Sequence, residues 1–277
     1  MNKSYFRLPC KVGAPSMVFG EDLLENVRLL ADIVDHIEIV LFYTPTLHNI
    51  PGFQEARILK KIGAQENVTF TVHLPDSLEI ASQDRRRQEE SVQLARELFL
   101  KMAEFEPLHY ILHIPFSPPT LVPIPGLYFT TGHKQEWGEW TKRALESLEI
   151  LHGALGKNKK ILVENINYSP SFLEPLWENG FCELCLDLGH LMLGQEKVMD
   201  LVKQYLDVTQ EIHLHGVEGY REHLSLSVLP THLVHKWLKY LLTTSFKGVI
   251  NLEVFSPRDL EESMDIVLET FSPAARG

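Results

Sequence analysis

The chain has 277 residues, of which 44% are hydrophobic, and it carries a formal net charge of -11 at pH 7. This length allows a substantial buried core, and the acidic balance argues against a groove that follows nucleic acid, because such binding needs clustered Lys and Arg. The N-terminal stretch MNKSYFRLPC lacks a long apolar run, no later run reaches membrane-spanning length, and three cysteines are too few for a disulfide framework. We therefore expect a cytoplasmic protein that acts on a small-molecule substrate, with neither a nucleic-acid nor a membrane partner; the oligomeric state stays open.

Short runs of β-branched and apolar residues recur along the chain and predict strands. They lie at 10–15, 36–42, 68–74, 109–114, 160–165, 183–188, 211–216 and 249–255. Segments with helical periodicity lie between and after them, at 21–33, 52–62, 91–105, 137–151, 169–179, 195–205, 230–242 and 257–271. This alternation over about 250 residues predicts an α/β fold, a (β/α)₈ TIM barrel, as a single domain over 1–277. A doubly wound open sheet is the alternative, but no glycine-rich nucleotide-binding loop occurs at a strand end.

Ionisable side chains stand at the C-terminal ends of six successive predicted strands. In chain order they are His73, His113, Glu164, Asp187, the pair His213 and His215, and Glu253. This end of a TIM barrel carries the active site, and alternate residues of each strand point towards the axis. One such residue alone is usually a hydrogen-bonded core or rim group. Burying several charges at one mouth is costly unless cations offset them, so the series predicts a metal site.

The ligand types indicate which ion binds. Imidazole combined with carboxylate, without thiolate, suits Zn²⁺, Mn²⁺ or Fe²⁺ better than Ca²⁺ or Mg²⁺, and we expect Zn²⁺. The predicted ligands are His73, His113, Glu164, Asp187, His190, His213, His223 and Glu253. These are more than one ion takes, so two or three ions are predicted. His215, Glu222 and Glu38 are further candidates, and Glu38, in mid-strand, is equally well explained as a buried, partnered carboxylate.

The short motifs that carry these residues are VHLP, LHIP, VENIN, CLDLGH, HLHG and LEVF. They resemble the metal-binding pattern of the xylose isomerase-like TIM barrel superfamily, most closely its endonuclease IV branch, in which such residues hold a three-zinc cluster. The resemblance covers essentially the whole predicted barrel. The spacing of Asp187 and His190 is its most specific element.

The resemblance also implies how the ligands divide among the ions. It assigns to the first ion His73, His113 and Glu164. It assigns to the second ion, with a bridging Glu164, the residues Asp187, His213 and Glu253. It assigns to the third ion His190 and His223.

The chain departs from the family pattern in two places. Where relatives carry Asp two residues before the last His, this chain has Arg221. The third ion therefore lacks a ligand unless Glu222 or His215 supplies it. His215 itself stands where relatives usually carry an acidic or amide residue, and it is either a third-site ligand or a partner of a ligand.

The opening portion of the chain bears on the substrate. GAPSMVFGEDLLENVRLLADIVDHIEIVLF, followed by TFTVHLP and YILHIP, resembles the cobamide-remodelling phosphodiesterases, which cleave the phosphoester in the nucleotide loop of corrinoids related to vitamin B12. The resemblance implies a metal-dependent phosphodiesterase with a corrinoid substrate. Its catalytic residues would be Glu164, which bridges the ions, and Glu253, which orients the attacking water. The proline-rich loop over 115–134 is either a lid on this substrate or a segment packed on its own barrel.

Two other functions stay open. A sugar or keto-acid isomerase or epimerase would hold one divalent ion with the four residues Glu164, Asp187, His213 and Glu253, and two carboxylates would move a proton between adjacent carbons. That function leaves the remaining histidines unexplained. A non-enzymatic metal or corrinoid carrier would bind its ligand without turnover.

Overall fold

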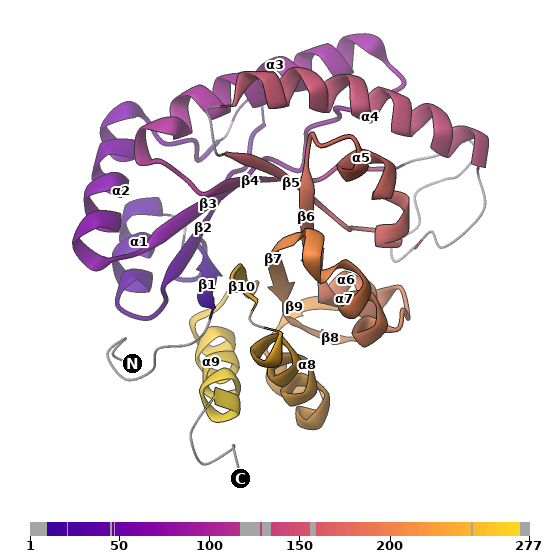
Figure 1. Ribbon diagram of the computed structural model, residues 1–277. Coiled ribbons are helices and arrows are strands. Elements are labelled where there is room, and N and C mark those ends of the chain that lie inside the picture. The colour runs from indigo at the N-terminus through magenta and orange to yellow at the C-terminus, as the bar shows by residue number, and fades with distance from the viewer. Residues whose placement is uncertain are drawn as a thin grey trace.

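The computed structural model describes residues 10–20, 22–44, 46, 48–116, 128, 134–155, 159–244 and 246–271. They form a closed barrel of eight parallel strands in the order β1-β10-β7-β6-β5-β4-β3-β2, which confirms the predicted TIM barrel (Figure 1). The barrel strands are β1 (Lys11–Pro15), β2 (His36–Val40), β3 (Thr69–His73), β4 (His109–Leu112), β5 (Lys160–Glu164), β6 (Glu183–Asp187), β7 (Thr209–Leu214) and β10 (Val249–Leu252).

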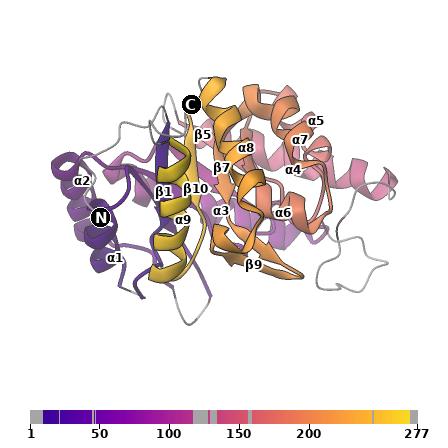
Figure 2. The same ribbon diagram turned by 90° about the horizontal axis from the view of Figure 1, so that it is seen from below.

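Helices surround the strands on the outside of the barrel (Figure 1). They are α1 (Leu23–Ala31), α2 (Phe53–Glu66), α3 (Arg85–Met102), α4 (Lys134–Ala154), α5 (Glu174–Glu178), α6 (Leu188–Leu193), α7 (Val198–Tyr205), α8 (Thr231–Thr243) and α9 (Pro257–Phe271). Short 3₁₀ turns lie at η2 (Ala103–Phe105), η3 (Pro170–Phe172), η4 (Leu206–Val208) and η5 (Leu226–Val228). α9 runs alongside β10 and packs against α8, as Figure 2 also shows.

Local chemistry sets several helix starts. The Asp22 carboxylate caps α1 by accepting from the Glu25 N–H at 2.8 Å. Asp84 caps α3 in the same way, so the run of three arginines that follows forms the exposed first turn of that helix. The predicted helix over 169–179 is instead η3 followed by the short α5, because Pro170 and Pro175 each stand near a helix start and cannot continue a preceding turn.

Two further elements lie at the C-terminal end of the barrel, and the periodicity of the sequence does not predict them. α6 begins directly after β6, and an antiparallel hairpin of β8 (Gly216–Glu218) and β9 (Arg221–Leu224) follows β7. Both are too short to show a periodic pattern. Together they carry His190, Glu222 and His223.

The strands are buried on both faces, and the two faces differ in chemistry. On β2, Ile37 and Ile39 belong to the apolar core cluster, whereas His36 and Glu38 alternate with them and are fully buried. The same alternation on β7 pairs Ile212 and Leu214 with buried acidic and imidazole groups. The side chains that alternate with the apolar ones on these strands are therefore polar. This face of the strands can carry a charged site at one end of the barrel.

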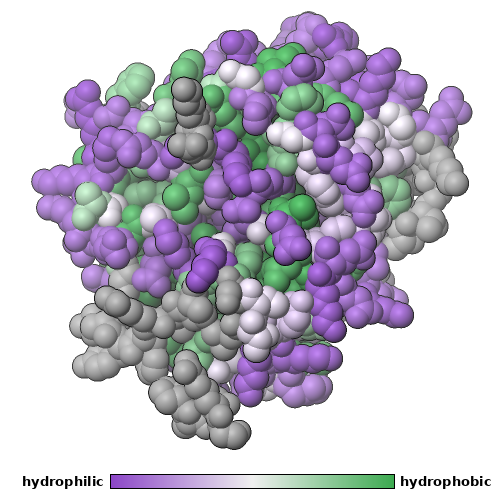
Figure 3. Space-filling model, in the orientation of Figure 1, coloured by the Kyte–Doolittle hydropathy of each residue, from purple (hydrophilic) through white to green (hydrophobic). Residues whose placement is uncertain are grey.

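The face of the molecule in Figure 3 is mostly hydrophilic, with hydrophobic residues scattered among the polar ones. Within the described ranges, no helix combines the length and apolar character that crossing a membrane requires.

Candidate metal centre

The predicted ligands all lie at the C-terminal end of the barrel. His73, Glu164 and Asp187 are the last residues of β3, β5 and β6, and His113 and Glu253 directly follow β4 and β10. His213 is in β7, His190 in α6 and His223 in β9. The eight residues predicted from the sequence are therefore brought to one mouth.

A central set of four buried residues could hold one ion. The ligand atoms of Glu164, Asp187, His213 and Glu253 lie within 4.8 Å of one another. His213 Nδ1 is 3.3 Å from Glu164 Oε2, 3.3 Å from Glu253 Oε2 and 3.8 Å from Asp187 Oδ2. This nitrogen therefore faces three carboxylates at once.

A second set lies on one side of Glu164. His73 Nε2 is 3.4 Å and His113 Nε2 is 3.3 Å from the same oxygen, Glu164 Oε2. Asp76 Oδ1 lies 3.0 Å from His113 Nδ1, on the far side of that ring. Asp76 was not predicted from the sequence, because it lies in the loop after β3 and not at a strand end. Glu164 thus stands between two groups of potential ligands.

A third set lies towards α6 and the hairpin. His215 Nε2 is 3.3 Å from Asp187 Oδ2, and His223 Nδ1 is 3.5 Å from Glu253 Oε2. His190 Nε2 is 3.6 Å from Glu222 Oε2. This brings two of the further candidates, His215 and Glu222, to the mouth.

Arg221, which stands where the resemblance predicts an Asp ligand, does not join this third set. Its side chain is 73% exposed and pairs with Glu218 at 3.8 Å. It therefore offers the mouth neither a ligand nor a neutralising cation.

Asp187 is oriented by its backbone surroundings. Its Oδ1 accepts the His190 N–H at 2.6 Å and caps α6, which leaves Oδ2 to face the histidines. The Asn165 side chain makes two further bonds to the Asp187 backbone, each 2.9 Å long. Asn165 follows Glu164 in the VENIN motif, yet only the folded arrangement reveals its part.

Glu38 lies behind the candidate metal centre and forms a hydrogen bond with His213, one of the predicted ligands. Its Oε2 accepts from His213 Nε2 at 2.9 Å and from Asn251 Nδ2 at 3.0 Å, and all three side chains are fully buried. The bond keeps the proton on Nε2, so the His213 Nδ1 lone pair faces the carboxylates.

Acidic and imidazole groups at the mouth shift one another's pKa values. Burial would raise the pKa of Glu164, but His213 and His113 beside it hold that pKa well below its usual range. Burial opposes the charging of His113, yet Glu164 and Asp76 hold the His113 pKa well above its usual range. Positive and negative groups at the mouth therefore stabilise one another.

The chemistry of the set fits divalent ions. Within the described part of the chain, five buried atoms of the predicted ligands lack a hydrogen-bond partner: Glu164 Oε2, Asp187 Oδ2, Glu253 Oε2, His113 Nε2 and His213 Nδ1. An unpartnered buried polar atom costs about 1–3 kcal/mol, so this many at one mouth require an explanation. Nitrogen and carboxylate donors suit Zn²⁺, Mn²⁺ and Fe²⁺, and these buried clusters indicate divalent-metal binding.

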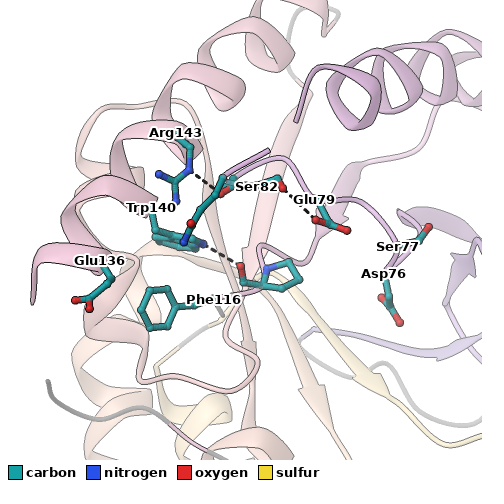
Figure 4. Close-up of a pocket in the computed structure, with 11 residues that line it drawn as sticks. Asp76, Ser77, Glu79, Ser82, Phe116, Glu136, Trp140 and Arg143 are labelled. Atoms are coloured by element: carbon teal, nitrogen blue, oxygen red, sulfur yellow. Dashed lines mark hydrogen bonds between the residues drawn. The ribbon is translucent and has the colours of Figure 1, made fainter. Parts of the chain in front are cut away.

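The centre opens into a pocket of about 380 Å³. Phe42, Tyr43 and Phe255 line it together with Glu164 and Glu253. A second pocket, of about 510 Å³, shares Asp76 and Ser77 with the first. Figure 4 shows these two residues on one side of the second pocket and Phe116, Trp140 and Arg143 on the other. Most of the predicted 115–134 loop lies outside the described residues.

No protein-family model matches the chain, and no curated protein matches it. Among solved structures it is similar to a D-tagatose 3-epimerase-like protein, with 20% identity over 95% of this chain and 100% of that chain and a TM-score of 0.69. It is similar to an L-ribulose 3-epimerase, with 15% identity over 96% and 93% of the two chains and a TM-score of 0.67. It is also similar to endonuclease IV from Thermus thermophilus, with 14% identity over 94% and 98% and a TM-score of 0.63. These similarities show that the fold is a TIM barrel of the xylose isomerase-like kind.

Proposed function

We propose that this protein is a metal-dependent phosphodiesterase that cleaves a small-molecule phosphodiester at the barrel mouth. The observation that carries the proposal is the number of ligand atoms around the central set. His73 and His113 face Glu164 on one side, and His190 and His223 lie on the side of Asp187 and Glu253. One ion takes about four to six ligands, so this arrangement is explained best by more than one ion.

Neighbouring divalent ions, when bound, lower the pKa of water and neutralise charge on phosphate oxygens. The chain's own residues hold and orient the reactants. Glu164 lies between two ligand sets and is placed to serve both. Glu253 lines the pocket and is 7% exposed, so its carboxylate can accept a hydrogen bond from an attacking water and orient it.

The pocket supports a substrate with one phosphodiester on a largely uncharged body. Phe42, Tyr43 and Phe255 offer flat apolar area beside the ligand groups. The net charge of -11 disfavours a polyanion such as duplex DNA. The resemblance of the opening portion of the chain to cobamide-remodelling phosphodiesterases makes a corrinoid the first substrate to test.

A one-metal sugar epimerase is the second candidate, and the structural neighbours favour it. Several of the similar solved structures are named as sugar epimerases, such as the L-ribulose 3-epimerase, or as epimerase-like, such as the D-tagatose 3-epimerase-like protein. The central set suffices for one ion, and Glu164 and Glu253 are two carboxylates that could move a proton between carbons. This function gives no role to the pair His73 and His113.

One experiment separates these functions. Protein loaded with Zn²⁺ or Mn²⁺ is incubated with cobalamin, with ketose and aldose sugars, and with duplex DNA that contains an abasic site. We expect two or more equivalents of metal by elemental analysis and a corrinoid product that has lost its lower base. Sugar interconversion with one equivalent would establish the epimerase instead, nicking of the DNA would overturn the substrate class, and corrinoid binding without turnover would indicate a carrier.

A further inference from the structure

Histidine tautomers can be read from the hydrogen bonds at the mouth. A neutral imidazole has one N–H and one lone pair, and only the nitrogen with the lone pair can bind a metal. In five of the mouth histidines one nitrogen faces a backbone carbonyl or carboxylate within 3.1 Å and must carry the proton. These bonds are His73 Nδ1 to Leu74 O, His113 Nδ1 to Asp76 Oδ1, His190 Nδ1 to Asn165 O, His213 Nε2 to Glu38 Oε2 and His223 Nδ1 to Glu253 O.

His215 differs from these five histidines, because its hydrogen bond to the backbone is accepted and not donated. Its Nδ1 accepts the backbone N–H of His223 at 3.0 Å. A backbone N–H can only donate, so the lone pair of His215 lies on Nδ1 and the proton on Nε2. The Gly216 carbonyl lies 3.3 Å from the same nitrogen, but Nδ1 cannot donate to it while it accepts the shorter bond.

The neighbouring backbone holds this arrangement in place. His223 has a φ of 56°, in the left-handed region, where its N–H faces back to His215. On the other side, a Cβ added to Gly189 would lie 1.9 Å from His215 Cε1. The imidazole therefore packs directly on the α6 backbone at the one position without a side chain.

We propose that His215 is a positioning residue and not a metal ligand, and that its Nε2–H holds the Asp187 carboxylate in place. Distance alone would allow His215 as a ligand, since its atoms fall within reach of Asp187, His190, His223 and Glu253. The tautomer excludes that role because Nε2, the atom at the mouth, bears a proton. Nε2 lies 3.3 Å from Asp187 Oδ2 and 4.0 Å from Glu253 Oε2, so Asp187 is the nearer partner.

The inference rests on the proposed metal centre but not on which reaction it performs. It also bears on the third ion. With Arg221 turned to Glu218 and His215 excluded, only Glu222 of the two candidates is left to complete the set with His190 and His223.

The test counts metal and does not depend on turnover. His215→Asn keeps an acceptor near Nδ1 but removes the Nε2 donor, whereas His215→Gln restores an N–H near the Nε2 position. His213→Gln is the matched control, because it keeps an N–H near Nε2 for Glu38 but removes the Nδ1 lone pair that His213 presents to the carboxylates. Metal equivalents are measured by elemental analysis at saturation, and affinity is measured by competition with a chelator.

We expect His215→Asn to keep the wild-type number of equivalents and to lose about 10–100-fold in metal affinity, as loss of a partner of a ligand does. His215→Gln should recover most of that affinity, and His213→Gln should lose at least one equivalent. Loss of one equivalent in both His215 variants, or wild-type affinity in His215→Asn, would overturn the assignment.

If His215→Asn fails to fold, Gly189→Ala tests the same contact between His215 and Asp187 in another way. Its methyl group would push the imidazole away from Asp187, so we again expect full equivalents with lower affinity. A lost equivalent in Gly189→Ala would contradict the positioning role. A wild-type protein that binds no transition metal would overturn the metal centre itself, which is a separate and distinguishable result.

Discussion

Histidines lie at both ends of this barrel, and their neighbours differ. At the C-terminal mouth, His113 lies beside Glu164 and Asp76, which hold its pKa well above the usual range. At the opposite end, burial together with Lys160 and Lys159 lowers the pKa of His109 to about 4. The same side chain is thus surrounded by carboxylates at one end and by ammonium groups at the other.

An unpaired imidazole nitrogen alone does not distinguish the two ends, because His109 Nδ1 at the opposite end is also buried without a hydrogen-bond partner in the described part of the chain. His36, at that same end, is fully satisfied. Both nitrogens of the fully buried His36 have hydroxyl partners, Thr69 Oγ1 and Thr71 Oγ1, each at 2.9 Å. Among the described residues, His113 and His213 each leave one buried nitrogen without a hydrogen-bond partner. A histidine in a barrel strand therefore indicates a metal site only when its neighbours are acidic and its second nitrogen is left unpaired.

The largest effect should come from the mouth. We expect Glu164→Gln and His213→Ala each to lower the turnover of the proposed reaction by at least about 100-fold. Loss of a residue that only orients a metal ligand costs about 10–100-fold, and loss of a ligand itself should cost more. The fold should be retained, since both residues lie where barrels carry their site. Rates, metal content and far-ultraviolet circular dichroism test this together. Turnover at the wild-type rate with unaltered metal content would refute the residue assignment.

A substitution at the opposite end of the barrel should lower the stability of the fold and leave metal binding unchanged. His36→Ala leaves a cavity and removes two hydrogen bonds to threonine hydroxyls, so the free energy of unfolding should fall by about 2–4 kcal/mol. Metal equivalents should stay at the wild-type value. Chemical denaturation and elemental analysis measure the two quantities. A loss of metal without a loss of stability would remove the distinction between the two ends.

Glu38 lies between these ends and should act on the mouth. Glu38→Gln weakens the acceptor that keeps the proton on His213 Nε2, and we expect metal affinity to fall by about 10–100-fold. Glu211→Gln is the matched control, because Glu211 is equally buried in the same barrel but has Thr71 and His36 as its partners. Burial and the nearby Glu38 raise the pKa of Glu211 well above its usual range, so a neutral amide changes it little. Equal losses in both variants would show a general effect of barrel packing.

The smallest effect should be a pH dependence from His109. Its folded pKa of about 4 lies below the unfolded value of 6.5, so the unfolded chain binds the proton more readily. Stability should therefore be lost as pH falls through 6.5 towards 4, and this group contributes a loss of about 2 kcal/mol between pH 7 and 5. Denaturation with a chelator present isolates this contribution from metal loss. His109→Gln should flatten the profile, and an unchanged slope would contradict it.

Residue type and strand position predicted which residues gather at the mouth, and their roles as ligands stay predictions. Six of the eight predicted ligands meet at one mouth because every strand of a parallel barrel ends on the same side, and α6 and the hairpin bring His190 and His223 to the same mouth. Asp76 and Asn165 were not predicted, because a loop carboxylate and a backbone-binding amide have no periodic signal. The extent of the domain over 1–277, the cytoplasmic location, and the absence of nucleic-acid and membrane partners stay predictions.

The sequence by itself determined the alternation of strand and helix and the kinds of ligand at the strand ends, because periodicity and side-chain chemistry are local properties. Only the tertiary structure decided which nitrogen of each histidine faces the centre. That choice depends on partners distant in the chain: Glu38 lies 175 residues from His213, and Asn165 lies 25 residues from His190. His213 and His215 look alike at the end of β7, and both carry the proton on Nε2, but His213 turns its Nδ1 lone pair to the carboxylates whereas His215 turns its Nε2–H to them. A buried carboxylate sets the first orientation and a left-handed backbone turn sets the second.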